Sequence, residues 1–411
     1  MRKLFVFAAV LAVVCLAVPA FATNGDNIIG VGAISRSMGG VGAAAPQDAI
    51  SAVFGNPAAM CYIPCESSEV DFAATLFVPK ISAKVGTSAP LPAANVSSDS
   101  RGLPYAFPAI GIYTPITPDL RFGLAAYGVS GLGVDYKDTA LKNSGLGPFD
   151  IKTDLQIMKF SPNLAYRILP NLSIGAALQV NWAQLDLEEG SAHTFSFGTQ
   201  VGAIYKPIDA LSLGLTYQSP QNNKFRRVFN FDEALGSTTF DTLNLEQPQQ
   251  VVLGVAYDII PNKLLVEVNE KWINWKDADG YKDFDWRDQY VTAVGIQGRP
   301  IDWLALRVGY NYGKSPVTEH NNWNPAGLSS IQGTAVPTAQ LEGFRVIGFP
   351  AIVEHHVTAG VGVNLSKKVS VNLGYMHAFE NTIKETSAFN LIQYESKLHE
   401  DSYELGLNIM F

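Results

Sequence analysis

Residues 403–411 read YELGLNIMF, and apolar side chains stand at every second position of this stretch. Such period-2 alternation is typical of a β-strand that has one apolar and one polar face. The alternation runs to an aromatic residue, Phe411. A strand that ends in this way favours a transmembrane β-barrel over a soluble sandwich.

The same alternation recurs upstream, at residues 172–182, 304–312 and 369–376. In each segment one face is apolar with an aromatic residue near one end, and the other face is small and polar. In a barrel the apolar face points to lipid, the polar face lines the lumen, and aromatic residues mark the membrane interface. In a soluble sandwich the apolar face would point into a core, and the sequence alone leaves that alternative open.

Residues 1–22 have the features of a secretory signal peptide. Arg2 and Lys3 precede an apolar run at residues 4–18, and Ala20-Phe21-Ala22 forms a small-residue cleavage site. Secretion together with a barrel predicts the outer membrane of a Gram-negative bacterium, with lipid and lipopolysaccharide around the protein. The terminal Phe411 resembles the signal by which such barrels are recognised for insertion, so we expect the barrel-assembly machinery as a partner.

Loop lengths predict the strand number. Six short turns rich in Pro, Asn, Asp and Lys alternate with longer connections. An up-and-down barrel has this pattern, with short periplasmic turns and longer extracellular loops. We therefore expect fourteen antiparallel strands near residues 67–80, 104–115, 119–129, 154–168, 171–187, 195–206, 210–218, 250–259, 263–275, 289–299, 302–312, 355–365, 369–378 and 402–411.

A segment rich in Gly and Ala precedes the first expected strand. Residues 23–65 suit a hatch that plugs the lumen, with a short helix at 47–54, and residues 66–411 would form the barrel. A disordered periplasmic tail is the alternative for this segment. Cys61 and Cys65 stand close together, and the periplasm is oxidising. A disulfide between them is possible, and two separate thiols or a metal pair are the alternatives, although two cysteines alone supply too few ligands for zinc.

Several stretches resemble the outer-membrane fatty-acid and aromatic-hydrocarbon transporters, the FadL/TodX family. The likeness is clearest in SRSMGGVG at residues 35–42 and in Asn56-Pro57-Ala58, and it extends to SPNLAYR at residues 161–167. The resemblance implies a fourteen-stranded barrel plugged by an N-terminal hatch that contains Asn56, Pro57 and Ala58. It also implies transport of hydrophobic small molecules, long-chain fatty acids or aromatic hydrocarbons, as ligands.

The family resemblance further implies lateral release through a gap at an inward kink of the third strand. In this chain Gly128, Gly131 and Gly133 break the alternation where that strand ends. Glycine within a strand marks a bulge or bend, and it adopts positive φ readily. These three glycines are the candidate lateral gate, and an ordinary strand-to-loop transition is the alternative.

Candidate pocket residues come from strand parity and from the long loops. Lys271 and Arg307 fall on the expected inner face, where either could pair with a ligand carboxylate. Salt bridges that brace the wall are the alternative role. Trp323, Phe344 and Phe349 lie in the expected loop 313–354 and suit apolar capture.

Composition narrows the function classes. The chain has 411 residues, of which 16% are charged, and its net charge of -8 argues against nucleic acid as a partner. No metal-ligand spacing or catalytic motif stands out, so we expect no metal, no cofactor and no enzymatic activity. The expected function is uptake of hydrophobic molecules. The alternatives are a general porin or structural barrel and, less favoured, a barrel-type lipid hydrolase.

Overall fold

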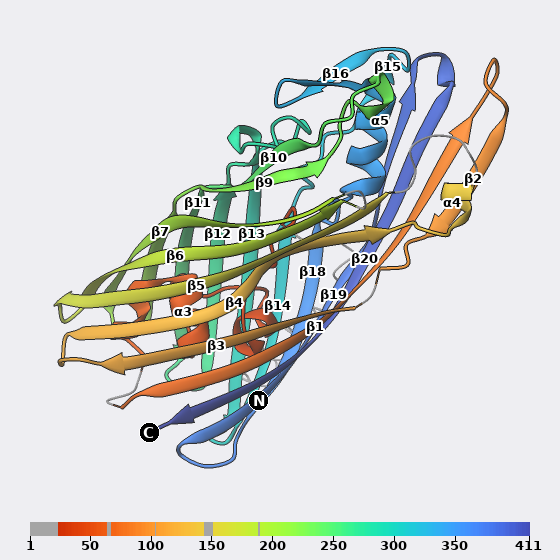
Figure 1. Ribbon diagram of the computed structural model, residues 1–411. Coiled ribbons are helices and arrows are strands. Elements are labelled where there is room, and N and C mark those ends of the chain that lie inside the picture. The colour runs from red at the N-terminus through yellow and green to blue at the C-terminus, as the bar shows by residue number, and fades with distance from the viewer. Residues whose placement is uncertain (1–23, 64–66, 103, 144–150, 188–189) are drawn as a thin grey trace.

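A closed antiparallel β-barrel dominates the computed structural model, which describes residues 24–63, 67–102, 104–143, 151–187 and 190–411 (Figure 1). The barrel has 14 strands. They are β1 (Glu69–Thr87), β3 (Tyr105–Pro115), β4 (Leu120–Asp135), β5 (Lys152–Leu169), β6 (Leu172–Leu187), β7 (Gly190–Ile208), β8 (Leu211–Gln218), β11 (Gln250–Ile260), β12 (Leu264–Ile273), β13 (Gln289–Ile301), β14 (Leu304–Gly313), β18 (His355–Asn364), β19 (Val369–Ser387) and β20 (Ile392–Met410). The fourteen expected strands and the fold class are confirmed.

The barrel closes between its first and last strands. β1 pairs with β20 along all 19 residues of each, from Glu69 opposite Met410 to Thr87 opposite Ile392. The hydrocarbon core of a membrane offers no water to unpaired backbone groups, so a closed sheet is one of the two architectures that can cross it.

The strand bounds differ from expectation mainly at the loop end. Residues 379–401 were expected to form a long loop, and this is wrong, because β19 runs to Ser387 and β20 begins at Ile392. β1, β4 and β7 also extend past their expected ends. Alternation stays regular there, but polar residues take the outward-facing positions that apolar residues occupy in the membrane belt. Hydrophobic periodicity alone therefore predicted strands that end too early.

Shorter elements occupy the connections at the loop end. β2 (Ala94–Asp99) and β15 (Asn321–Trp323) extend the barrel sheet, while β9 (Gln221–Phe229) with β10 (Asp241–Gln247) and β16 (Leu328–Ile331) with β17 (Thr334–Pro337) form separate hairpins. The helical elements there are α4 (Ala140–Asn143), η2 (Glu233–Leu235), η3 (Trp275–Asp277), α5 (Thr338–Gly343), the π-helix η4 (Phe344–Gly348) and η5 (Ala388–Asn390). None of the helices in the described residues is both long and apolar enough to cross a membrane.

The outer surface of the barrel carries an apolar belt between two aromatic girdles. Leu164, Leu215, Leu253, Leu306 and Leu373 are between 47% and 57% exposed and point outward. Exposed aromatic side chains border this belt near the short turns (Tyr166, Tyr205, Tyr257 and Trp303) and toward the loops (Tyr217, Tyr290, Tyr375 and Tyr403). The apolar faces therefore point outward, and the sandwich alternative is wrong.

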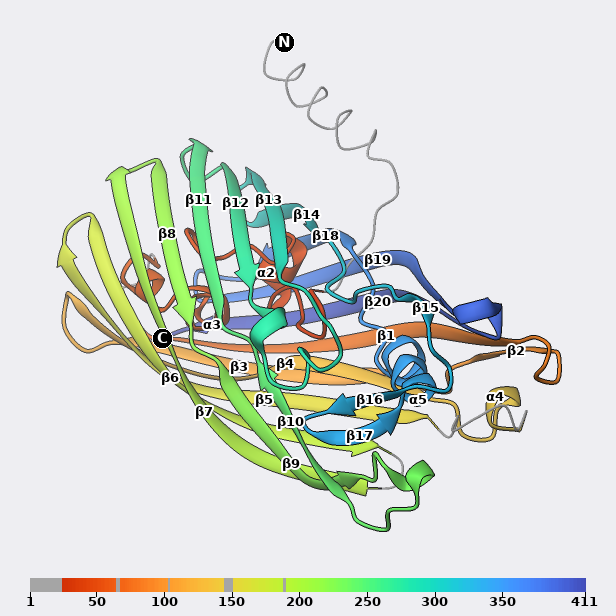
Figure 2. The same ribbon diagram turned by 90° about the horizontal axis from the view of Figure 1, so that it is seen from above.

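The N-terminal segment lies inside the barrel (Figure 2). It contains α2 (Ala33–Ser37), α3 (Ala49–Gly55) and η1 (Pro57–Cys61), so the expected helix at 47–54 is confirmed with a shift of about two residues. Asp48 caps α3 by accepting a hydrogen bond from the Ser51 amide at 2.8 Å. The hatch therefore fills the lumen at the level of the belt.

Glycines on the inner wall let the hatch approach the strands closely. A β-carbon at Gly175 would lie 2.5 Å from the Ala58 amide nitrogen, and one at Gly214 would lie 1.9 Å from the Ala43 carbonyl oxygen. The same holds for further wall glycines that face hatch atoms: Gly111, Gly123, Gly202, Gly254, Gly295, Gly309, Gly360 and Gly374. The wall and the hatch are thus both built from small residues because their backbones almost touch.

A charge placed on the belt tests this orientation. Val308 and Leu373 are 40% and 50% exposed between the girdles, so Val308→Arg or Leu373→Arg should destabilise the barrel by about 2–4 kcal/mol. The matched control is Ser370→Arg, whose side chain lines an open polar cavity at the short-turn end of the lumen. Urea titration of the protein in lipid vesicles measures the difference, and equal midpoints for all three variants would contradict the assignment.

Candidate functional site

An apolar cleft opens among the loops at the extracellular end. Its walls come from the β9–β10 hairpin, the β16–β17 hairpin, the α5–η4 segment and the ends of β5 and β6. Apolar side chains dominate the lining: Ile151, Leu187, Phe229, Phe231, Ile331, Val336, Leu341 and Phe344. We call this the outer cleft. An apolar surface of this kind, held open at the molecular surface, is suited to a hydrophobic small molecule.

A cluster of buried aromatic rings lies beneath the outer cleft. Trp275, Tyr281, Phe284, Trp286 and Phe349 are each at most 2% exposed. Ring centroids lie 4.6 Å apart for Trp275 and Tyr281, and 4.8 Å apart for Tyr281 and Trp286. Phe344 of the outer cleft lies 5.9 Å from Phe349, so the cleft and the aromatic cluster are in direct contact.

A second cavity lies within the lumen, between the hatch and the wall, and two lysines line it. We call it the luminal cavity. Lys159 donates to Gln179 Oε1 and Gln218 Oε1, each at 3.3 Å, and Lys271 faces the same space from β12. No carboxylate in the described part of the chain lies within ion-pair distance of either ammonium group. The rest of the lining mixes Gln200, Gln247, Gln250 and Thr216 with Ile28, Val41, Phe54, Val129 and Val252.

The third barrel strand, β4, departs from regular pairing next to the luminal cavity. Its ladder with β3 ends at Tyr127 opposite Ala109, although both strands continue. Its ladder with β5 shifts between Gly128 and Ser130, which leaves Val129 as an extra residue. Such a β-bulge bends a strand locally. The predicted irregularity at the third strand is therefore present, and the backbone pairing of the wall is incomplete there.

The glycines of β4 are needed for the space that a missing side chain leaves, and not for positive φ. Among the described residues, Gly128, Gly131 and Gly133 do not have positive φ. The expectation that glycine is needed at these positions for positive φ is therefore wrong. A β-carbon at Gly131 would lie 3.0 Å from the Phe107 ring, and one at Gly133 would lie 1.6 Å from the Tyr105 hydroxyl oxygen. These glycines make room for the two aromatic rings of β3, which cover the unpaired stretch.

The first residues of the hatch occupy the inner side of the same stretch. The Ile28 amide donates to the Val129 carbonyl at 3.1 Å, and the Gly131 amide donates to the Asp26 carbonyl at 3.4 Å. The Tyr281 hydroxyl donates to the Asp26 carboxylate. Burial raises the pKa of Asp26 to about 6. Residues 24–28, which we call the N-terminal strap, therefore join β4 to the aromatic cluster.

The strap separates two spaces. The luminal cavity is lined by Asn27, Ile28 and Val129 on one side of it. A smaller cavity is lined by Gly25, Tyr105 and Gly133 on the other side, toward the wall. A molecule that passes from the lumen to the wall at β3 and β4 must displace this strap.

The predicted hatch motif anchors the hatch to the wall. The Asn56 side-chain amide donates to the carbonyls of Ala43 at 2.7 Å and Ala203 at 3.1 Å. Pro57 begins η1, and the Ala58 carbonyl accepts from Ser173 Oγ at 2.9 Å. Asn56, Pro57 and Ala58 thus have structural contacts and are not among the residues that line the outer cleft or the luminal cavity.

The predicted pocket residues do not form one site. Phe344 lines the outer cleft, Phe349 belongs to the aromatic cluster and Lys271 lines the luminal cavity. Trp323 is buried and stacks on Tyr394 with ring centroids 5.8 Å apart. Arg307 lies on the periplasmic side of the hatch, where it donates to Gln297 Oε1 at 2.6 Å and Asn372 Oδ1 at 2.8 Å. These contacts brace the wall through neutral amides, and not through the salt bridge that the alternative expected.

The predicted disulfide stays a prediction. Cys61 is buried at the end of η1, and its Sγ atom lies 3.8 Å from the Asp119 carbonyl oxygen. Cys65 lies outside the described residues, as does the expected signal peptide at residues 1–22.

Sequence reasoning missed Lys159 and the N-terminal strap. Lys159 has the same parity as Ser161 and Asn163 in an expected strand, so the alternation already predicted that its side chain points inward. Residues 24–28 show no hydrophobic periodicity. Their position depends on backbone hydrogen bonds to a bulge that forms only when β4 is folded.

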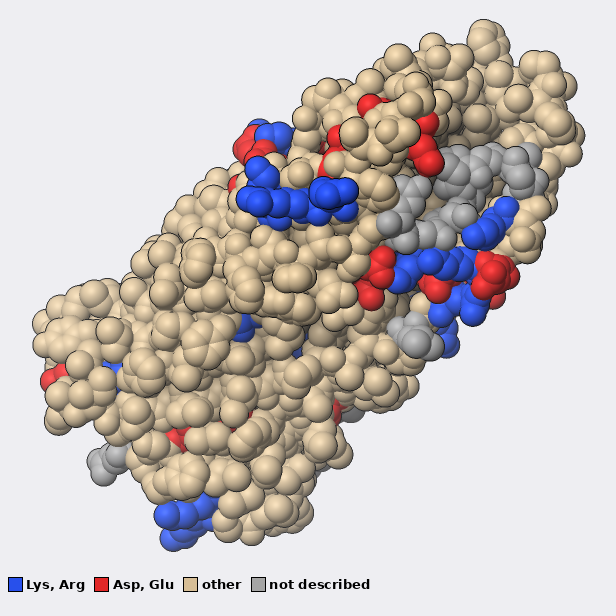
Figure 3. Space-filling model, in the orientation of Figure 1, with Lys and Arg blue, Asp and Glu red and all other residues tan. Residues whose placement is uncertain are grey.

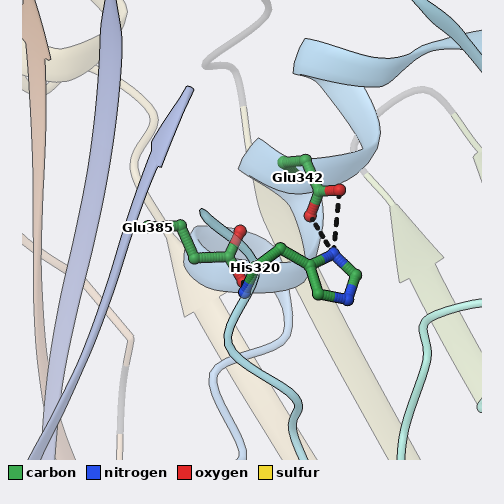
Figure 4. A group of neighbouring side chains, drawn as sticks. All are labelled: His320, Glu342 and Glu385. Atoms are coloured by element: carbon green, nitrogen blue, oxygen red, sulfur yellow. Dashed lines mark hydrogen bonds and ion pairs between the residues drawn. The ribbon is translucent and has the colours of Figure 1, made fainter. Parts of the chain in front are cut away.

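A charged cluster near the outer cleft has the donor types of a metal site but a different role (Figure 4). Donor atoms of His320, Glu342 and Glu385 lie within 4.8 Å of one another. Arg345 Nη1 lies 2.8 Å from His320 Nδ1 and 3.2 Å from Glu385 Oε1, and it also pairs with Glu342. The guanidinium therefore supplies the positive charge that a cation would bring, and the cluster ties α5 to β19 and to His320.

The barrel, the plugged lumen, the apolar outer cleft and the incomplete ladder at β4 together define an outer-membrane transport barrel. Residues 9–194 and 186–327 match the model of one family, "Outer membrane protein transport protein (OMPP1/FadL/TodX)". The chain belongs to this family. The expected family, transport class and outer-membrane location are confirmed.

Solved structures share the fold. The toluene transporter TodX of Pseudomonas putida is 18% identical, with a TM-score of 0.67 over 95% of this chain and 100% of that chain. A FadL homologue of Pseudomonas aeruginosa is 14% identical, with a TM-score of 0.68 over 95% and 99%. The toluene transporter TbuX of Ralstonia pickettii is 15% identical, with a TM-score of 0.59 over 93% and 98%.

One curated relative matches in sequence over a shorter stretch. An uncharacterized protein from the 5' region of the phosphoenolpyruvate carboxykinase gene of Chlorobium limicola is 43% identical over 81 residues. That match spans 20% of this chain and 39% of the relative.

The His320 cluster predicts a pH-dependent loop. A hydrogen bond to Glu342 raises the pKa of His320 above its ordinary value of 6.5, so the charged imidazole stabilises the folded loop. This contribution is complete below the unfolded pKa and is lost as the pH rises through the raised folded value. Hydrogen exchange within residues 313–354, corrected for intrinsic rates, should therefore show more frequent opening at about pH 8.5 than at about pH 5.5.

The variant His320→Gln should remove that pH dependence, and His193→Gln, on the exposed face of β7, should keep it. If His320→Gln keeps the full pH dependence, the titrating group is another member of the cluster.

Proposed function

We propose that this protein takes up hydrophobic small molecules through three sites in sequence. The outer cleft captures the molecule, the luminal cavity holds it between the hatch and the wall, and the unpaired stretch of β4 releases it sideways into the membrane. Residues 1–22 would be the cleaved signal peptide, 23–65 the hatch and 66–411 the barrel.

The observation that carries this proposal is an apolar cleft at the loop end of a barrel whose lumen is filled. A hydrophobic solute is repelled by the polar outer surface of the membrane rather than by its interior. An open aqueous pore gives such a solute no advantage, whereas an apolar cleft does. The plugged lumen also argues against the general porin.

The two luminal lysines favour a ligand with an anionic head and an apolar tail. A carboxylate between Lys159 and Lys271 would give these ammonium groups the charged acceptor that the described protein atoms do not provide. The apolar tail would lie toward Ile28, Phe54 and Val129. We therefore propose long-chain carboxylic acids as the leading substrate class.

Neutral aromatic hydrocarbons are the second candidate. Two structures with this fold are described as toluene transporters, and the outer cleft contains Phe229, Phe231 and Phe344. These rings suit a flat arene as well as an alkyl chain. A lipid hydrolase is the least supported function, because the family model describes a transport protein.

Charge removal in the luminal cavity tests the substrate class. We expect Lys159→Gln and Lys271→Gln each to weaken oleate binding to the purified protein by about tenfold, the usual size of one charge-assisted contact. Binding of methyl oleate and of toluene, measured in parallel, should be unchanged. If the affinities for oleate and methyl oleate fall equally, the substitution has damaged the cavity. If the affinity for oleate does not fall, the lysines do not bind a carboxylate, and that part of the proposal is wrong.

Filling the space beside β4 tests the lateral exit. In Gly131→Val and Gly133→Val the new side chains would occupy the volume of the Phe107 and Tyr105 rings, so both rings must shift within the exit. Oleate uptake by cells should fall several-fold, while oleate binding to the purified protein is retained. The matched control is Gly298→Val on β13, where a β-carbon would meet nothing within 4 Å. Undiminished uptake in both β4 variants would place the exit elsewhere, most simply through the hatch.

A further inference from the structure

Three basic side chains stand together on the outer surface of the β9–β10 hairpin. Lys224, Arg226 and Arg227 are all exposed. Figure 3 shows Lys and Arg atoms gathered in one band over the position of β9, above a wide uncharged surface. We call these three residues the β9 basic patch. It is a concentration of positive charge on a chain with a net charge of -8.

The backbone of β9 is irregular at the patch. Neighbouring residues of a regular strand point to opposite faces. Arg226 and Arg227 are nevertheless both exposed, while Phe225 and Val228 beside them are fully buried. Arg227 has φ 56°, and the pairing with β10 shifts between Leu243 and Asp241. The left-handed conformation is unfavourable for a residue with a β-carbon, so the fold holds both guanidinium groups outward at a cost in backbone strain.

The patch differs from three other cations at the loop end, which have acidic partners. Arg101 pairs with Asp138 at 2.9 Å, Lys152 pairs with Asp186, and Lys282 pairs with Asp279. No carboxylate among the described residues lies within ion-pair distance of the patch. Three cations are therefore held close together without a counter-charge from the described protein.

The patch lies beside exposed aromatic side chains at the loop end of β7. Gly198 of β7 faces Gln221 of β9, and Gly190 faces the carbonyls of Arg227 and Val228, so the two strands run antiparallel side by side. Lys224 is three residues beyond Gln221, which brings it level with Phe195. Phe195 and Phe197 are 62% and 66% exposed on the outer face of β7. Exposed apolar side chains therefore lie directly beside the patch on the outer surface, on the loop side of the girdle residue Tyr217.

We propose that the β9 basic patch binds the phosphate groups of a phosphorylated glycolipid of the outer leaflet, of the lipid A type. The acyl chains of this lipid would lie against Phe195 and Phe197. Arginine binds phosphate through two parallel hydrogen bonds, and two adjacent guanidinium groups with one ammonium match a headgroup that carries two phosphates. The proposal rests on the outer-membrane location of the barrel and does not depend on the transported substrate.

The bound lipid would also fix one wall of the outer cleft. Phe229 and Phe231 follow the patch directly in sequence and line the cleft. The hairpin forms a separate two-stranded sheet, so its pairing does not extend the barrel ladder. A lipid held by the patch therefore ties this hairpin to the membrane surface beside the capture site.

Native mass spectrometry of the purified full-length protein with diphosphoryl lipid A tests the proposal. The variant Lys224→Gln/Arg226→Gln/Arg227→Asn removes the charges, and Asn is chosen because it tolerates the left-handed conformation. Lipid A affinity should fall more than about tenfold in this variant and about fivefold in Arg226→Gln alone. The matched control Lys263→Gln/Lys367→Gln/Lys368→Gln removes three exposed charges at the opposite rim and should bind as the parent does.

Two further probes separate the possible ligands. Dephosphorylated lipid A should bind weakly, and inorganic phosphate at equal concentration should not compete. Unchanged lipid A affinity in both patch variants, or equal binding of the dephosphorylated lipid, would overturn the proposal. Effective competition by inorganic phosphate would mean that the patch recognises a free anion and not a lipid. Oleate binding to the same variants is measured separately, so the lipid A result stands even if the proposed transport of oleate is wrong.

Discussion

The requirement that every backbone group in a membrane finds a partner governs this structure. The 19-residue ladder between β1 and β20 meets it by closing the sheet. The stretch of β4 beyond Tyr127 is the exception, because β3 does not pair with it. There the Val129 carbonyl and the Gly131 amide bond to the N-terminal strap instead. The strap therefore completes the wall from inside, and any movement of the strap leaves backbone groups to be satisfied by water or by a passing ligand.

Closure of the barrel creates an interior that must be filled, and the hatch fills it with small residues and paired charges. Arg36 donates to Glu404 at 2.6 Å, and both side chains are almost fully buried. Arg36 also donates to Ser402 Oγ at 2.8 Å, so two of its nitrogens are satisfied by β20. A buried ion pair adds little net stability, but removal of one partner is costly because the other charge stays desolvated. Such pairs fix where the hatch sits more than they add to its stability.

Alternation predicted most of the barrel because each strand separates lipid from a polar lumen. It gave all fourteen strands and the inward direction of Lys271 and Arg307. It missed the ends of β1, β19 and β20, where the outward face becomes polar and apolar side chains such as Ile81, Ile383 and Leu398 lie on the inner face instead. The outer cleft was not predictable, because Phe229 comes from the connection between β8 and β11, whereas Ile331 and Phe344 come from the connection between β14 and β18. The meeting of these two loops depends on tertiary packing. The physical reason for glycine at positions 131 and 133 was misjudged, because the rings of Phe107 and Tyr105 that need their space stand on another strand.

The outer cleft and the gap in the wall are joined by continuous contacts. Phe344 lies 5.9 Å from Phe349, Phe349 lies 6.3 Å from Tyr281, and the Tyr281 hydroxyl bonds to Asp26 of the strap. Gly25 has φ 67°, and a β-carbon there would lie 2.6 Å from the Trp275 ring, so the strap packs closely against the aromatic cluster. Contact alone transmits nothing unless a ligand binds more tightly to one arrangement than to another. A molecule that enters beside Phe344 meets that condition when it takes the place of a ring of the cluster, because the strap then loses the surface that holds Asp26 and Gly25 against β4.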